Sequence, residues 1–225
     1  MRNPQNYAKM PTVRKNKLFD YAFLATGLLV QVATYCVVPN SPLSLVSGLL
    51  GICSVVLCSQ GNILSFAFGF AQVITYTYLC IAERFYGEIA INVYYFVTML
   101  YGVYVWRKRL NKSSGESHTV QAQHLSKRML GLISLGCTVV ALAVGVLLAR
   151  YTDDTQPYLD AFTTVPAIVA QLLMVMAYRE QWYLWLAVDI LSMVMWLYAG
   201  DYCLAAQYLF WCANCVYGLY NWKKL

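Results

Sequence analysis

Charged side chains are scarce in this chain of 225 residues. Asp, Glu, Lys and Arg make up 12% of it, whereas about 25% is usual in soluble domains. Hydrophobic residues make up 60%. A chain with this balance cannot cover a water-facing surface with charge, so the composition excludes an ordinary soluble globular domain. It indicates a protein embedded in a membrane.

Catalytic signatures are missing as well. The sequence has no GxSxG, HExxH or glycine-rich phosphate-binding motif. Its two histidines, His118 and His124, lie in a polar linker, and the last apolar run has no lysine that could hold retinal as a Schiff base. Cys212 and Cys215 form a CxxC, but without nearby histidines they are better explained by packing than by a metal or redox site. We therefore expect neither an enzyme nor a bound cofactor.

Eight apolar runs approach the roughly 20 helical residues that are needed to cross the hydrocarbon core of a membrane. The first run follows a basic segment and has no small-residue cleavage site after it, so we expect it to remain as an anchor rather than a removed signal peptide. The predicted membrane helices cover residues 18–38, 43–59, 63–82, 89–106, 129–149, 158–178, 182–199 and 202–222.

Positive charge lies almost entirely on one side of these predicted helices. If the amino terminus faces the cytoplasm, all of the 16 Lys and Arg residues except Arg84 and Arg150 fall in cytoplasmic segments. This is the asymmetry of the positive-inside rule. We therefore predict that both termini are cytoplasmic. The net charge of +6 then reflects topology, and we expect no nucleic-acid partner.

The fourth and eighth predicted helices end in nearly the same sequence, YGVYVW at 101–106 and YGLYNW at 217–222. Three helices followed by one connecting helix re-enter the membrane in the original direction, so two such units are parallel, as in SWEET carriers. We predict an all-α, SWEET-like membrane protein with an extra amino-terminal helix and two parallel three-helix bundles joined by a connecting helix. The expected segments are 1–40 (tail and extra helix), 41–109 (first repeat), 110–128 (mobile cytoplasmic loop), 129–150 (connecting helix) and 151–225 (second repeat).

Polar side chains inside membrane helices are costly, which makes them functional candidates. Trp182, Trp185 and Asp189 stand at i, i+3 and i+7 and therefore share one face of a predicted helix. Two indoles beside a carboxylate suit a flat cationic ring, which stacks on tryptophan and is balanced by the negative charge. The alternative is that the two tryptophans are ordinary aromatic residues of the membrane interface.

Amide and aromatic side chains of three other helices complete the predicted site. Amides supply donors and acceptors for a ligand with a carboxamide and hydroxyl groups, although pairing between helices is a common use of Gln and Asn in membranes. Two further deep amides, Gln31 and Gln171, carry no assigned role. The candidates are Phe68, Gln72 and Tyr76 in 63–82, Asn92 in 89–106, and Gln207, Trp211, Asn214 and Tyr217 in 202–222.

These motifs resemble those of the PnuC vitamin transporters from Leu18 to Lys224: an extra first helix, two YGxYxW closures, and WxxWxxxD at 182–189. The resemblance implies a carrier of the bacterial inner membrane that takes up nicotinamide riboside, an NAD precursor, by facilitated diffusion. It implies that a cytoplasmic riboside kinase traps the substrate, that the carrier is a homotrimer, and that Trp182, Trp185 and Asp189 line the pocket. Gln72, Tyr76, Asn92, Gln207, Asn214 and Tyr217 look like the rest of that pocket.

Other functions remain open at this point. A sister carrier for thiamine or riboflavin would have the same architecture and differ only in its pocket lining. A sugar carrier of the SWEET type fits the duplication but not the tandem tryptophans with an acid, and a membrane receptor or assembly factor would use the same helices without transport. Since Asp189 has no acidic or histidine relay leading from it, we expect uniport, with a central pocket that opens alternately to either side as the repeats rock.

Overall fold

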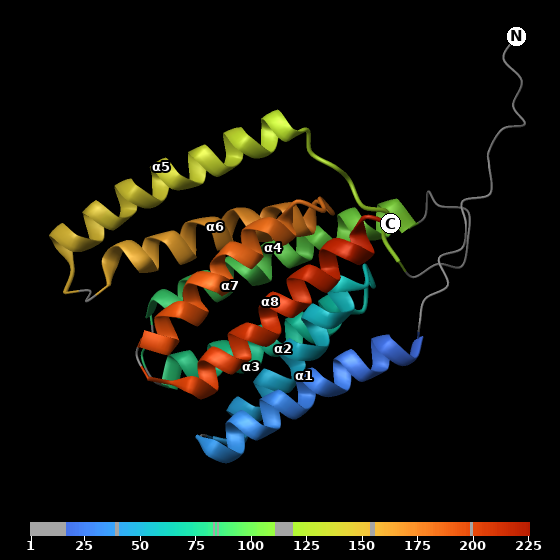
Figure 1. Cartoon of the computed structure of the whole chain (residues 1–225), viewed down its shortest axis with the longest axis horizontal. Helices are drawn as coiled ribbons and strands as arrows, with labels where there is room; N and C mark the ends of the chain where they lie inside the picture. Colours follow the sequence, from blue (N-terminus) through green and yellow to red (C-terminus); the bar gives the residue numbers. More distant parts are fainter. Residues whose placement is uncertain are drawn as a thin grey trace, which may run out of the picture.

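The computed structural model describes residues 17–38, 41–82, 84, 86–110, 119–153, 156–198 and 200–225. Eight helices account for most of these residues (Figure 1). They coincide with the predicted spans, and the largest difference is at the fourth, which continues four residues beyond Trp106. The helices are α1 (Lys17–Val37), α2 (Pro42–Ser59), α3 (Ser65–Ala82), α4 (Tyr86–Leu110), α5 (Lys127–Tyr151), α6 (Pro157–Val175), α7 (Gln181–Tyr198) and α8 (Tyr202–Trp222).

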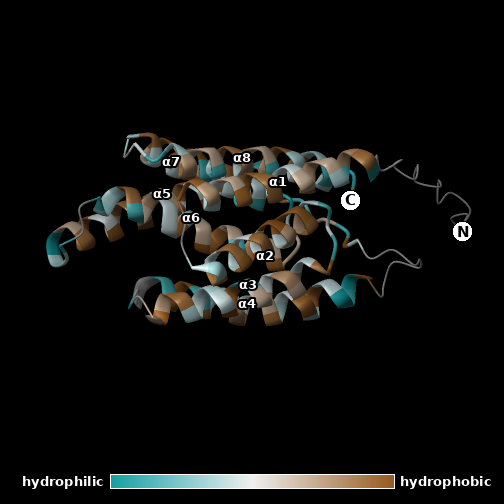
Figure 2. Cartoon of the chain, turned by 90° about the horizontal axis from the view of Figure 1, so that it is seen from below, coloured by the Kyte–Doolittle hydropathy of each residue, from teal (hydrophilic) through white to brown (hydrophobic). Residues whose placement is uncertain are grey.

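The outer surface of the molecule is apolar. Figure 2 shows hydrophobic residues along the length of the helices, and α5 exposes a series of Leu and Val side chains. Within the described part of the chain, α1 to α6 are long and apolar enough to cross a membrane. The last two helices have similar lengths but carry amides, tyrosines, tryptophans and Asp189, which lowers their hydropathy. The chain is a multi-pass membrane protein, and α7 and α8 carry polar side chains within their spans.

Six of the described helices form a closed ring. Neighbours along the ring are α2 and α3, α3 and α4, α4 and α6, α6 and α7, α7 and α8, and α8 and α2. The first triplet, α2 to α4, therefore meets the second, α6 to α8, at two equivalent interfaces. Outside the ring, α1 packs on α2 and α8, and α5 packs on α6 (Figure 1). Side chains that point into the ring come from both triplets, as a shared binding site requires.

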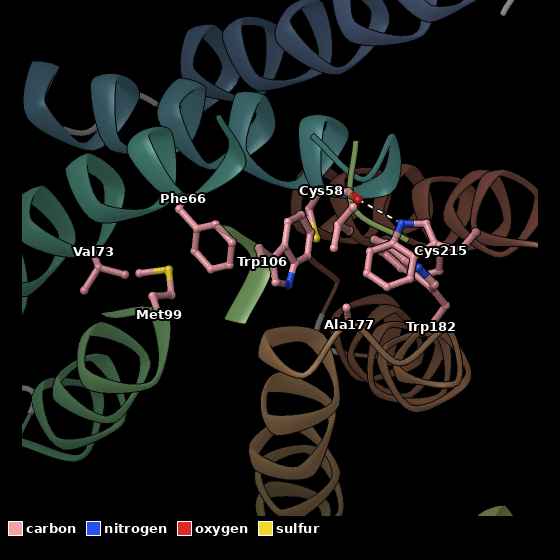
Figure 3. Close-up of a cluster of buried hydrophobic side chains, with 10 residues drawn as sticks. Cys58, Phe66, Val73, Met99, Trp106, Ala177, Trp182 and Cys215 are labelled. Atoms are coloured by element: carbon pink, nitrogen blue, oxygen red, sulfur yellow. Dashed lines mark hydrogen bonds between the residues drawn. The ribbon is translucent and has the colours of Figure 1, made fainter. Parts of the chain in front are cut away.

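One end of the ring, which we call the tryptophan end, is filled by a buried aromatic cluster. The cluster contains Cys58 at the end of α2, Ala177 just after α6, Trp106 near the end of α4, Trp182 at the start of α7, and Trp222 at the end of α8. Figure 3 shows this cluster with Trp106 near its centre. Corresponding helices of the two triplets thus end, or begin, on the same side of the molecule. The predicted parallel arrangement of the triplets is confirmed.

The tryptophan that closes each YGxYxW motif bonds to the other triplet. Trp106 Nε1 donates to the Met174 carbonyl of α6 at 3.2 Å. Trp222 Nε1 donates to the Cys58 carbonyl of α2 at 2.9 Å, the dashed line in Figure 3. Both indoles are fully buried. Because Cys58 and Met174 are the penultimate residues of α2 and α6, the two bonds are equivalent, and together they clasp the triplets to each other.

The turns that follow α2 and α6 also have the same backbone conformation. Gly61 has a φ of 68° and Ala177 a φ of 61°. In each turn the next residue, Asn62 or Tyr178, donates its N–H back to a carbonyl in the last turn of the helix, as in a Schellman motif. Glycine adopts this left-handed conformation freely, whereas alanine does so at an energetic cost. The strained position in the second triplet is therefore held by its surroundings.

The linker between the repeats supplies part of that support. Val120 N–H donates to the Gly61 carbonyl at 2.8 Å, and Gln123 N–H donates to the Ala177 carbonyl at 2.7 Å. Residues 119–125, which we call the strap, thus bind the same backbone position in both triplets. Val120 is completely buried within the aromatic cluster. This part of the predicted mobile loop is therefore fixed to the ring, while residues 111–118, like the tail before Lys17, lie outside the described residues.

A buried acid holds the far end of the strap. Glu180 is only 6% exposed, and its carboxylate accepts a hydrogen bond from Leu125 N–H at 3.0 Å. His124 Nδ1 lies 3.6 Å from the other carboxylate oxygen. The Gln123 side chain adds a bond to the Met176 carbonyl at 3.0 Å. The strap is therefore anchored more firmly to the second triplet than to the first.

Replacing Trp222 with phenylalanine should destabilise the protein. The substitution keeps an aromatic ring but removes the indole N–H, which is one of two donors to the Cys58 carbonyl beside the Gly61 N–H. The loss of such a hydrogen bond costs roughly 0.5–1.5 kcal/mol. Trp106→Phe should have a similar effect through Met174. We expect both variants to lower the thermal unfolding midpoint in detergent, whereas Tyr198→Phe, at a residue that is 90% exposed, should leave it unchanged. Unchanged midpoints in both tryptophan variants would show that the clasp does not stabilise the ring.

Candidate functional site

Asp189 lies half-way along α7 and faces α8. The Cys215 thiol donates a hydrogen bond to its Oδ2 atom, with the two atoms 3.3 Å apart. Tyr208, two turns earlier on α8, lies within electrostatic reach of the same carboxylate. The acid is therefore turned toward protein and away from the lipid-facing surface. An inward carboxylate in the middle of a membrane helix is placed to attract a cation.

Three tyrosines from three helices converge on this region. Tyr208 of α8 lies within electrostatic reach of Tyr76 of α3 and of Tyr95 of α4. All three interact with Glu88 near the start of α4. Tyr208 thus connects Asp189 with phenol groups of the first triplet, and each phenol can donate and accept a hydrogen bond.

Sequence reasoning selected Tyr76 among these tyrosines but missed Tyr95 and Tyr208. Tyr208 lies on another face of α8 from the stripe of Gln207 and Asn214 that drew attention. Its only sequence signal is the i, i+7 spacing to Cys215, which places both side chains on the face that meets Asp189. That signal becomes informative only when the α7–α8 contact is known.

Trp182 is buried inside the tryptophan end, with 4% of its surface exposed. Its indole lies flat against Gly218, where an added Cβ would come within 2.5 Å of the ring. The Trp222 ring meets it edge to face at a centroid distance of 5.9 Å. A side chain in this position is not an ordinary interfacial aromatic. Its indole N–H has no hydrogen-bond partner within the described part of the chain.

In the first triplet, the position equivalent to Trp182 holds an aromatic ring without an N–H group. Phe66 occupies the position equivalent to Trp182, by the offset between the two YGxYxW motifs. It packs against Gly102 and meets Trp106 edge to face at 5.0 Å. A phenyl ring is therefore sufficient for packing at this place in the fold. The buried polar N–H is particular to the second triplet.

Asn214 shows a second departure from the repeat. It is 2% exposed, and none of the described residues forms a hydrogen bond with its Oδ1 atom. The equivalent residue of the first triplet, Thr98, is paired with Gln171 of α6, whose Nε2 donates to Thr98 Oγ1 at 3.3 Å. In α2 the position equivalent to Gln171 is Val55, which cannot donate. A ligand with a donor group would satisfy the Asn214 oxygen.

Two more tryptophans border the same interior. Trp185, one turn from both Trp182 and Asp189 on α7, contacts the aromatic cluster and also a smaller apolar cluster with Ala170 of α6. Trp211 of α8 packs against the buried cluster that joins α2 and α8. Both side chains are only partly buried. They provide aromatic surface between the tryptophan end and Asp189.

Gln207 and Tyr217 face α1 instead. Gln207 Nε2 donates to Gln31 Oε1 at 3.0 Å, and the Tyr217 hydroxyl donates to Asp20. The Tyr217 ring also packs on Phe23, with centroids 4.7 Å apart. The structure therefore does not bring these two side chains to Asp189. In this conformation they join the extra helix to the ring, the interhelical use of amides and aromatics noted above.

The remaining candidates stay within the first triplet. The Gln72 side chain lies against α2 at Gly51, and Phe68 lies one turn before it on the same face of α3. Asn92 is 3% exposed, and its Nδ2 donates to the Glu88 carbonyl of its own helix at 2.7 Å. Phe68 and Gln72 share α3 with Tyr76, and Asn92 shares α4 with Tyr95.

Gln181 is a buried amide that the sequence analysis did not select. It is fully buried, and neither its amide nitrogen nor its amide oxygen has a hydrogen-bond partner in the described ranges. It directly precedes Trp182, so two neighbouring residues of α7 carry unpaired polar groups. Among the described residues, no group of His, Cys, Asp and Glu side chains could hold a metal ion. The interior thus offers hydrogen bonds, aromatic surface and one negative charge, which suits binding rather than bond chemistry.

Comparison with known proteins agrees with this picture. Residues 41–224 match the family model described as nicotinamide mononucleotide transporter. The chain is 33% identical over 210 residues to the nicotinamide riboside transporter PnuC of Haemophilus influenzae, covering 93% of this chain and 91% of the relative. It is 33% identical over 215 residues to the PnuC of Neisseria mucosa, covering 92% and 81%.

A solved structure agrees as well. The crystal structure of the vitamin B3 transporter PnuC matches with a TM-score of 0.74 at 32% identity, over 92% of this chain and 91% of the other. These matches take in the whole ring and both YGxYxW motifs. The chain therefore belongs to the PnuC family of membrane transporters.

Proposed function

We propose that this protein carries nicotinamide riboside across the bacterial inner membrane by facilitated diffusion with alternating access. The observation that carries the proposal is Asp189, which faces α8 half-way along α7 and has the Tyr208 phenol within electrostatic reach. Tyr208 in turn lies within electrostatic reach of Tyr76 and Tyr95 of the first triplet. Nicotinamide riboside has a flat pyridinium cation, a carboxamide and ribose hydroxyls. Relatives that are 33% identical over more than 90% of this chain are named as transporters of that substrate.

Each part of this ligand has a matching group in the ring. The ribose hydroxyls would meet Asp189 and the tyrosines, and the cationic ring would be drawn to the same carboxylate. Trp185 offers an aromatic face one turn away. The carboxamide would then extend toward the tryptophan end, where it accepts from the Trp182 indole and donates to Asn214 Oδ1, both unpaired. The ligand would thus occupy the places where the second triplet departs from the first.

The tryptophan end is assigned to the cytoplasm. Lys108 and Arg109 at the end of α4, and Lys223 and Lys224 at the end of α8, lie at this end, while Arg84 and Arg150 lie at the other. This distribution follows the positive-inside rule. The carboxyl terminus then faces the cytoplasm, and so does the start of α1, which contacts Tyr217 through Asp20.

The cytoplasmic gate in this proposal is made of the tryptophan clasp and the strap. Buried Val120, Trp106 and Trp222 fill this end of the ring, so a substrate that leaves toward the cytoplasm must part them. Separation of the triplets would break both indole-to-carbonyl bonds and release the strap from Gly61 or Ala177. The gate therefore couples movement of one triplet relative to the other to the path of the substrate.

Two partners remain proposals. A uniporter only equilibrates its substrate, so a cytoplasmic riboside kinase would maintain inward flux by consuming it. A homotrimer is the proposed assembly.

No hydrogen-bonded chain of acids leads away from Asp189 among the described residues, and this supports uniport rather than ion coupling.

Replacing Asp189 with asparagine should weaken binding of the cationic riboside at least several-fold, because the side chain keeps its size but loses its charge. Affinity for the uncharged dihydro form of the same riboside should change little. Calorimetry on the purified protein measures both, with Asp160→Asn as a control at the other end of the ring. Equal losses of affinity for the two ligands, or no loss for either, would show that the negative charge of Asp189 does not contribute to binding.

Thiamine and riboflavin in the same titrations test the sister-carrier alternative.

Trp182→Phe should weaken riboside binding several-fold while leaving thermal stability nearly unchanged. Phe66 shows that a phenyl ring packs at the equivalent place, so the substitution mainly removes the unpaired indole N–H. Asn214→Ala should also weaken binding through loss of the buried acceptor. If both variants bind the riboside with wild-type affinity, the carboxamide lies elsewhere.

Gln123→Pro should loosen the cytoplasmic gate, because proline has no N–H to donate to the Ala177 carbonyl. Cys58, 8% exposed beneath the strap, then serves as a native reporter once the other cysteines are replaced by serine. A membrane-impermeant maleimide applied from the cytoplasmic side should label it several-fold faster. Gln123→Ala, which keeps the backbone N–H, is the control. Equal labelling of the two variants would argue against the strap as part of the gate.

A further inference from the structure

A groove lies outside the ring, on the outer side of α4 at the tryptophan end. Its volume is about 410 Å³, and its lining combines aromatic, basic and amide side chains. The proposed substrate path does not include it. The lining residues are Tyr101, Tyr104, Val105, Lys108, Arg109 and Gln121.

The basic part of the groove has two cationic side chains that can bind an anion. Lys108 Nζ stands 5.8 Å from the centre of the Tyr104 ring. Arg109 Nε is buried and has no hydrogen-bond partner among the residues that the structure describes. A buried, unpaired guanidinium N–H is costly, and a phosphate oxygen is the acceptor that guanidinium geometry matches best. Two adjacent cations, one with an unsatisfied donor, therefore point to a phosphate group.

The apolar part of the groove indicates what carries that phosphate. Val93, Val97, Leu100 and Tyr104 are all exposed, and their spacing of i, i+4, i+7 and i+11 places them on one face of α4. This face leads along the membrane helix into the groove. An acyl chain can lie along it, whereas a free phosphate ion would make no use of it. Tyrosines at the head of the stripe are typical of the membrane interface.

We propose that this groove binds an anionic phospholipid, with its phosphate between Lys108 and Arg109 and an acyl chain along the exposed face of α4. Gln121 of the strap lines the same groove. The lipid headgroup would therefore touch both the first triplet and the segment that crosses the tryptophan end.

The second triplet provides a matched comparison. Lys224 stands over Tyr220, 3.6 Å from the ring centre, in the positions equivalent to Lys108 and Tyr104. The residue equivalent to Arg109, however, is Leu225, whose side chain covers Gly61. The second triplet thus has the cation and the tyrosine but no guanidinium. We expect no tight lipid binding there.

Native mass spectrometry of the purified protein, titrated with dioleoylphosphatidylglycerol, tests the proposal. The double variant Lys108→Gln/Arg109→Gln should bind the lipid at least fivefold more weakly. Lys223→Gln/Lys224→Gln, which removes the same charge, should bind it like the wild type. Arg109→Lys keeps the charge but loses the planar donors, so it should also be weaker than the wild type.

Three results would overturn the lipid site. Equal losses in the two double variants would show that binding follows net charge alone. Equal binding of dioleoylphosphatidylcholine would show that an anionic headgroup is not required. Displacement of the lipid by inorganic phosphate at millimolar concentration would show a site for free phosphate. Riboside affinity measured on the same variants should equal that of the wild type, which separates this site from the transport site.

Discussion

Two hydrogen bonds, from Trp106 to the Met174 carbonyl and from Trp222 to the Cys58 carbonyl, are the interactions on which the rest of the structure depends. They are equivalent under the repeat, and they set the register of one triplet against the other at both interfaces of the ring. Both lie in a buried aromatic cluster, so breaking one leaves a buried indole N–H unpaired, while the carbonyl keeps the backbone N–H of Gly61 or Ala177. The strap adds backbone bonds to the same two turns. Closure of this end is therefore stable, and opening it requires that other partners replace these bonds.

The repeated triplets form the ring of helices, and the polar groups of the candidate site lie at positions where the two triplets differ. Where the first triplet has Val73, Phe66 and Thr98, the second has Asp189, Trp182 and Asn214. The first three side chains are apolar or already paired. The last three bring a charge, an unpaired N–H and an unpaired carbonyl oxygen into the same ring. A symmetric ring can thus hold an asymmetric ligand, since one triplet supplies most of the polar groups and the other supplies packing and Tyr76.

Sequence patterns were sufficient to predict where the helices lie and that the two triplets are parallel, because hydropathy and the repeated motif can be read from short stretches of the chain. They also selected Asp189, since an acid in mid-span is conspicuous. They did not separate the faces of α8: Gln207 and Tyr217 share a stripe with Asn214, yet only contact with α1 shows that the first two pair with Gln31 and Asp20. The strap was beyond prediction for a similar reason. Its acceptors are backbone carbonyls of Gly61 and Ala177, which carry no side-chain signature.

The central claim is that a small cationic ligand is bound inside the ring, between the two triplets and beside Asp189. A structure of the purified protein determined with nicotinamide riboside bound tests it most directly. The account predicts ligand density within the ring, with the pyridinium against a tryptophan of α7 and the ribose near Asp189 and Tyr208. Density between α1 and α8, or anywhere outside the ring, would contradict it.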